Sequence, residues 1–168
     1  MNRFKRTLKS INNFLVIPCG IILTAMTLVV FYDVFARYVF HKPLEWGMEI
    51  TTYMMLFIVF LGLGYTYQVD GHIRVDILFG VLSKKAQRAL YIVGSVLTLV
   101  YVGIFIWKTG ALAWEAYVDG LYSWTATKIY LFPVYIWMPI GGVLFFLTII
   151  SKLDDYIYPL RETNREQE

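Results

Sequence analysis

Residues 14–32 read FLVIPCGIILTAMTLVVFY and contain no charged residue. Three further stretches, 50–67, 89–107 and 129–150, also lack any charged side chain. Each reaches or approaches the roughly 20 residues that an α-helix needs to cross about 30 Å of hydrocarbon. Backbone groups in lipid must be hydrogen-bonded within their own segment, which favours helices. The sequence therefore predicts an all-α integral membrane protein with four transmembrane helices.

The composition of the whole chain agrees with this prediction. Apolar residues make up 58% and charged residues 16%, and the mean hydropathy is +0.59. These values are far from those of a soluble domain. The net charge of +3 is too small and too dispersed to suggest a nucleic-acid partner. The single cysteine, Cys19, excludes an intramolecular disulfide or a thiolate-rich metal site, and we interpret it as a small apolar residue of the first span.

Basic residues divide unevenly between the two sides that four spans would define. One side has eleven of them and the other four, which by the positive-inside rule predicts that both termini are cytoplasmic. The eleven are Arg3, Lys5, Arg6, Lys9, Arg74, Lys84, Lys85, Arg88, Lys152, Arg161 and Arg165, and the four are Arg37, Lys42, Lys108 and Lys128.

We expect a single membrane domain over residues 1–168. Two segments, 3–13 and 73–82, place apolar residues on one helical face with charges off it, which is typical of short amphipathic helices at the cytoplasmic interface. The alternative is a solvated linker that is helical because it continues a span. The predicted spans are about 14–36, 45–69, 86–110 and 129–151, followed by a polar cytoplasmic tail, 152–168. The interfacial basic residues are Arg3, Lys5, Arg6, Lys9, Lys84, Lys85 and Arg88.

Four charged residues gather where the first span ends and the second begins. Asp33 and Arg37 are four residues apart, as are Glu45 and Glu49, so each pair shares a helix face. The seam 38–44 is short, so the two helices must be antiparallel neighbours, and Arg37 can reach Glu45 or Glu49 across the hairpin. The simplest interpretation is a structural ion-pair cluster that locks the hairpin. A proton or ion relay and a contact to a partner protein are the alternatives, because charges at membrane depth often mark function.

No arrangement of residues in the sequence indicates a cofactor or a catalytic centre. His41 and His72 fall in the first and second seams, on opposite sides of the predicted membrane, so they cannot ligate one haem or metal. No nucleophile with a base and an orienting group is recognisable, and no glycine loop for phosphate. We therefore predict that the chain is not an enzyme and binds no cofactor.

The glycine and proline residues inside the predicted spans suggest helix packing and helix bending rather than ligand binding. Gly62 and Gly64, and the pair at 141–142, are expected to permit close approach of helices. Pro133 and Pro139 are expected to bend the fourth span. A broken, polar-lined site at the midplane, typical of transporters, is missing from the sequence pattern.

Several short motifs, taken in order, resemble one family of membrane proteins. The segment 37–40 (RYVF) is followed by 43–46 (PLEW) with Glu49, then 61–64 (LGLG) and 71–76 (GHIRVD). The segments 123–126 (SWTA), 132–135 (FPVY) and 139–141 (PIG) complete the set. Together they resemble the small membrane subunit, of DctQ type, of tripartite ATP-independent periplasmic (TRAP) transporters, over roughly residues 14–150. The motif positions singled out are Trp46, Gly62, Gly64, Gly71, His72 and Asp76.

The resemblance implies a role that depends on partners. In such systems a soluble periplasmic substrate-binding protein delivers an organic anion, such as a carboxylate or sialic acid. A large multi-span permease carries the anion inward with sodium, which the large subunit binds. The small subunit packs against that permease in the bacterial inner membrane, among its lipids. Two other classes stay open on the residues alone: the membrane anchor of a multi-subunit enzyme, and a self-sufficient channel or exporter.

Overall fold

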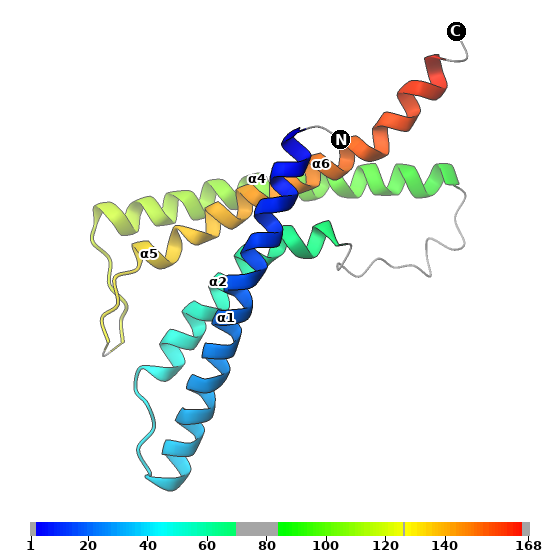
Figure 1. Ribbon diagram of the computed structural model, residues 1–168. Coiled ribbons are helices and arrows are strands. Elements are labelled where there is room, and N and C mark those ends of the chain that lie inside the picture. The colour runs from blue at the N-terminus through cyan, green and yellow to red at the C-terminus, as the bar shows by residue number, and fades with distance from the viewer. Residues whose placement is uncertain (1–2, 70–83, 126, 166–168) are drawn as a thin grey trace.

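The computed structural model describes residues 3–69, 84–125 and 127–165, and over these residues the chain is helical (Figure 1). The only β-type pairing within these ranges is an isolated antiparallel bridge between Tyr122 and Tyr130. The helices are α1 (Arg3–Val39), α2 (Gly47–Gln68), α4 (Lys84–Val118), α5 (Phe132–Tyr135) and α6 (Trp137–Arg165).

Four helical segments are long and apolar enough to cross a membrane, which confirms the prediction of an all-α chain with four candidate spans. They are Arg3–Val39, Gly47–Gln68, Ala89–Val118 and Phe132–Leu153. The first span and the predicted interfacial segment 3–13 form one uninterrupted helix, α1. The predicted interfacial helix 73–82 lies outside the described residues.

The helices are arranged as two antiparallel pairs that cross. In Figure 1, α1 and α2 lie side by side, α4 and α6 lie side by side, and the second pair runs across the first. Helix α6 is central, because it packs against both α2 and α4, and α1 also contacts it.

Two adjacent glycines of α6 explain how one helix can pack tightly against two others. A Cβ atom at Gly141 would collide with the backbone oxygen of Phe60 in α2. A Cβ at Gly142 would lie 2.9 Å from a side-chain carbon of Ile106 in α4. The packing role predicted for this pair is therefore confirmed. Gly62, in contrast, has no atom within 4 Å of its would-be Cβ, so the role predicted for that glycine within this chain is wrong.

The fourth span is interrupted near its start. Helix α5 contains Pro133 and ends at Tyr135, and α6 begins at Trp137. Pro139 has no N–H, so the carbonyl of Tyr135 loses its usual partner one turn along the helix. The two prolines lie on either side of this one-residue break, and the bend that they were expected to cause stays a prediction.

Candidate functional site

The turn between α1 and α2 is held by one carboxylate. Asp33 Oδ2 lies 2.6 Å from the Arg37 guanidinium, one turn along α1. Its second oxygen, Oδ1, accepts a hydrogen bond of 2.8 Å from the backbone N–H of Leu44. Asp33 therefore ties the end of α1 to the residues that lead into α2. The Arg37 side chain is 57% exposed, so its pair with Asp33 is a surface interaction of modest energy.

Glu49, in the first turns of α2, is hydrogen-bonded to a different part of the chain. The residue is 8% exposed, and its carboxylate accepts a hydrogen bond of 2.8 Å from the hydroxyl of Tyr53. The hydroxyls of Thr125 and Thr127, from the connection between α4 and α5, also donate to it. Glu49 thus joins the start of α2 to a loop that is distant in sequence, since Thr125 lies 76 residues further along the chain.

The predicted four-residue cluster is therefore divided into two parts. Within the described part of the chain, Arg37 pairs with Asp33, whereas the hydrogen-bond donors to Glu49 are neutral hydroxyl groups. The expected contact of Arg37 with Glu49 is not formed, because the loop hydroxyls occupy the carboxylate. Glu45 lies in the turn before α2 with an exposed side chain.

The α4–α5 connection forms a small hairpin that presents these hydroxyls. The N–H of Ser123 donates to the carbonyl of Ile129 at 2.9 Å, and that of Leu131 donates to the carbonyl of Leu121 at 3.0 Å. Lys128, with a φ of 45°, makes the turn. The hydroxyls at Ser123, Thr125 and Thr127 follow one another at 2.9 Å spacing. The N–H of Lys128 donates to the carbonyl of Thr125 at 3.2 Å, and this turn lies where the hydroxyls of Thr125 and Thr127 both reach Glu49.

An open groove of about 460 Å³ lies between this hairpin and the start of α2. Met48, which is 84% exposed, and the fully exposed Trp124 are on it. The carboxylates of Glu45 and Glu49 both line it, and no basic residue is among the residues that do. The lining residues are Glu45, Met48, Glu49, Thr52, Tyr53, Ser123, Trp124, Thr125, Leu131 and Tyr135.

A second polar cluster lies towards the other end of α2, and the sequence analysis did not single it out. The amide nitrogen of Asn12 donates to Gln68 Oε1 at 3.2 Å and to Thr148 Oγ1 at 3.1 Å, so it joins α1, α2 and α6. Gln68 in turn donates to Asn13 Oδ1 at 2.9 Å. Asn12 is fully buried and lies one helical turn after Leu8, which is also buried. The spacing of four residues from this apolar residue is the sequence signal that could have placed Asn12 on the buried face of α1.

The Asn12 amide also explains one family motif position, Gly64. A Cβ at Gly64 would lie 2.7 Å from Asn12 Oδ1, an oxygen for which the described residues supply no hydrogen-bond donor. Trp46, another motif position, directly precedes α2 and is 40% exposed. The remaining motif positions, Gly71, His72 and Asp76, lie outside the described residues.

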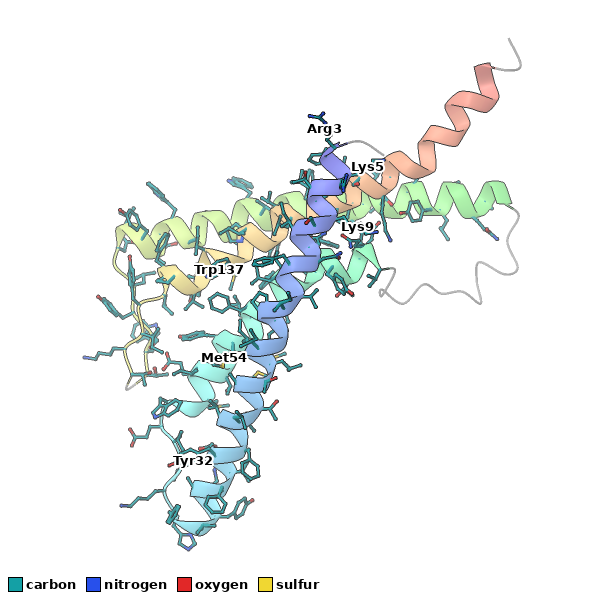
Figure 2. The ribbon with its side chains drawn as sticks, viewed as in Figure 1. Arg3, Lys5, Lys9, Tyr32, Met54 and Trp137 are labelled. Carbon is teal, nitrogen blue, oxygen red and sulfur yellow. The ribbon has the colours of Figure 1, made fainter. Side chains whose placement is uncertain are left out.

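The predicted interfacial basic residues fall at the beginnings of two helices. Figure 2 shows Arg3, Lys5 and Lys9 along the first turns of α1, at the opposite end of that helix from Tyr32. Arg6 lies in the same turns and is exposed. Lys84, Lys85 and Arg88 lie in the first turns of α4.

The described residues contain no group of three or more histidine, cysteine, aspartate or glutamate side chains that could hold a metal ion. What they contain is a set of polar contacts between helices and loops, one groove with two carboxylates, and long apolar helix faces.

Comparison with known sequences places this arrangement among transporter components. Residues 26–155 match the family described as tripartite ATP-independent periplasmic transporters, DctQ component. The ectoine TRAP transporter small permease protein of Halomonas elongata is 26% identical over 143 residues, covering 83% of this chain and 72% of that protein. The C4-dicarboxylate TRAP transporter small permease protein of Vibrio cholerae is 28% identical over 92 residues, covering 55% of this chain and 38% of that protein's own length.

Proposed function

The chain belongs to the family of DctQ components of tripartite ATP-independent periplasmic transporters, and from this premise we propose that it is a small permease subunit that acts as a scaffold. In this proposal it packs against a large multi-span permease in the bacterial inner membrane and stabilises it. The large permease carries an organic anion, such as a carboxylate or sialic acid, together with sodium, and it holds the sodium. A periplasmic substrate-binding protein delivers the anion.

The proposal rests on the positions of the hydrogen-bonded polar side chains along the helices. The described hydrogen bonds between side chains of different elements lie at Glu49, near the start of α2, and near the end of α2, around Asn12 and between Tyr67 and Tyr91. They connect elements of this chain to one another. A solute carrier needs polar groups that line a path or a midplane site. The polar contacts seen here favour a role in holding helices in place.

The outer faces of the helices support a partner in the membrane. Large apolar side chains are exposed along α1 and α4, including Phe14 at 69%, Phe31 at 69%, Leu97 at 65% and Trp107 at 70%. Lipid covers such faces in a lone subunit. Close packing against another helical protein would gain van der Waals contacts there, which is the main source of helix association in lipid.

Co-expression with a cognate large permease tests the proposal. Affinity purification through a tag on this chain should recover the two subunits together in a fixed ratio, in mild detergent. Recovery of this chain alone, under conditions where the large permease, purified separately through a tag of its own, is folded and stable, would contradict the proposed scaffold role.

A further inference from the structure

The first turns of α1 carry positive charge and no negative charge. Residues 3–9 include the basic residues Arg3, Lys5, Arg6 and Lys9, and the first acidic residue of the chain is Asp33, near the other end of the helix. Arg3, Arg6 and Lys9 are exposed, and the described residues form no ion pair with them. Basic residues gathered where a span leaves the hydrocarbon attract anionic groups at the membrane surface.

Packing fixes which side of these first turns faces away from the rest of the molecule. Leu8 is 5% exposed, and the fully buried Asn12, one turn further on, is hydrogen-bonded to α2 and α6. Each residue of an α-helix is rotated by about 100° from the one before it, so positions 6 and 10 lie on the opposite side from positions 8 and 12. This outer side continues along the span, because α1 is one helix from Arg3 to Val39.

The outer side of α1 changes from basic to apolar along its length. Positions 3, 6, 10, 14, 17 and 21 are three or four residues apart and therefore share this side. The residues at these positions are Arg3, Arg6, Ser10, Phe14, Ile17 and Ile21, and all six are exposed. By the rise of the helix, Arg6 lies about 12 Å from Phe14 along the axis. A charged group and an apolar surface thus follow one another on a single helix face.

One class of molecule has both chemistries in this order. An anionic phospholipid joins a phosphate group to acyl chains that lie along a transmembrane helix. Arginine binds phosphate through two parallel hydrogen bonds, and large apolar side chains pack against acyl chains. An acidic peptide would use only the basic positions of this face, and a transmembrane helix of another protein would use only the apolar ones. The sequence of charge and apolar surface therefore favours a lipid.

We propose that the outer side of the first turns of α1 is a binding site for an anionic phospholipid of the surrounding leaflet. The guanidinium groups of Arg3 and Arg6 and the hydroxyl of Ser10 donate hydrogen bonds to the phosphate. An acyl chain packs along Phe14 and Ile17. The site belongs to this chain alone, so it stands or falls separately from the subunit role proposed above.

Competition between two lipids tests the preference for negative charge. The full chain is placed in nanodiscs with equal amounts of dioleoylphosphatidylglycerol and dioleoylphosphatidylcholine, which have the same acyl chains and differ in the net charge of the headgroup. Native mass spectrometry then counts the lipids that stay bound when the chain is released. The first bound lipid should be mainly phosphatidylglycerol. Equal retention of the two lipids would overturn the proposal.

Variants show whether the two arginines hold the headgroup. Arg6→Gln should lower the ratio of bound phosphatidylglycerol to phosphatidylcholine roughly five-fold, which corresponds to about 1 kcal/mol for one basic residue near an anionic surface. Arg3→Gln together with Arg6→Gln should lower it further. The charge-matched control replaces Lys42, in the α1–α2 turn, and Lys108, in α4, by glutamine, because both are exposed and neither is on this face. An equal fall in the control would show a general effect of net charge and contradict the proposal.

Photo-crosslinking shows where the lipid binds. Benzoylphenylalanine replaces Phe14, or in a control Phe31, which is also 69% exposed on α1 but lies near the other end of the span. In the mixed nanodiscs, position 14 should crosslink to phosphatidylglycerol in excess over phosphatidylcholine, and position 31 should crosslink to both in proportion. Arg3→Gln with Arg6→Gln should remove the excess at position 14. No excess at position 14, or the same excess at position 31, would refute a site at the first turns of α1.

Discussion

At the scale of single residues, two covered polar side chains connect the helices, one near each end of α2. Asn12 joins α1 to α2 and α6, and Glu49 joins α2 to the α4–α5 hairpin. Lipid provides no hydrophobic force between helices, so specific hydrogen bonds and close packing have to fix their arrangement. These two residues therefore matter more than the exposed charges around them.

Arg37 and Glu49 are expected to act independently. Arg37→Ala removes a surface pair with Asp33 and should cost about 0–1 kcal/mol of unfolding free energy. Glu49→Ala removes the charged acceptor of three hydroxyls and should lower the unfolding free energy by more than Arg37→Ala does. A double-mutant cycle, measured by unfolding in mixed micelles, should give additive effects. A coupling energy well above about 1 kcal/mol would instead restore the direct pair that residue spacing suggested.

Gly64 should tolerate a methyl group only when Asn12 is shortened. Gly64→Ala places a Cβ 2.7 Å from the Asn12 amide oxygen and should destabilise the chain by about 1–3 kcal/mol. In an Asn12→Ala background the same change should cost much less, because the space is free. Gly62→Ala, two residues away with no neighbour within 4 Å, is the matched control and should be neutral or slightly stabilising. Equal costs at both glycines would disprove the proposed fit.

At the scale of helices, α6 determines how the two pairs are assembled. It packs against α2 through Gly141 and against α4 through Gly142, after a break that follows the proline-containing α5. The aromatic pairs Phe57–Trp137 and Tyr67–Phe145, with ring centroids 5.3 Å and 5.5 Å apart, extend the α2–α6 contact along the helices. The position of α2 therefore depends on α6 over much of its length.

A side chain at Gly141 should separate α6 from α2. Gly141→Ala drives a methyl group into the backbone of Phe60, which cannot rotate away as a flexible side chain could, so we expect a loss of about 2–4 kcal/mol. Disulfide crosslinking between cysteines introduced at 57 and 137 should fall in the variant. Gly103→Ala on α4, which meets no atom within 4 Å, is the control, and an equal fall there would show that the effect is not local.

At the scale of the whole molecule, two crossed helix pairs leave long apolar faces uncovered and place polar side chains at loops and helix ends. Figure 1 shows the beginning of α1 and the later part of α6 on the same side of the crossing, away from the α1–α2 turn. An even number of spans puts both termini on the same side of the membrane, and which side that is stays a prediction from the basic residues.

The orientation can be tested with an impermeant thiol reagent. Cysteine replaces Lys42 or Lys85 in a Cys19→Ser background. Lys42→Cys should be labelled in intact spheroplasts, and Lys85→Cys only after the membrane is permeabilised, because the basic residues place the second position in the cytoplasm. Labelling of both positions from the same side would refute the orientation.

Sequence periodicity and length were enough to predict the helices, since four uncharged stretches admit few other structures. Local spacing also showed that Asp33 and Arg37 share a face, and adjacent glycines indicated the close packing of α6. The partners of Glu49 could not be predicted in this way, because Thr125 and Thr127 reach it only after α4 and α6 have positioned the hairpin. Asn12 was missed for a related reason: its partners Gln68 and Thr148 are 56 and 136 residues away.

The most direct test of the scaffold role is solute uptake by purified subunits in liposomes with a sodium gradient. Three preparations are compared, holding this chain alone, the large permease alone and both together, each supplied with the binding protein loaded with its organic anion. We predict no uptake by this chain alone and sodium-dependent uptake by the pair, with less or none by the large permease alone. Uptake by this chain alone would contradict the account.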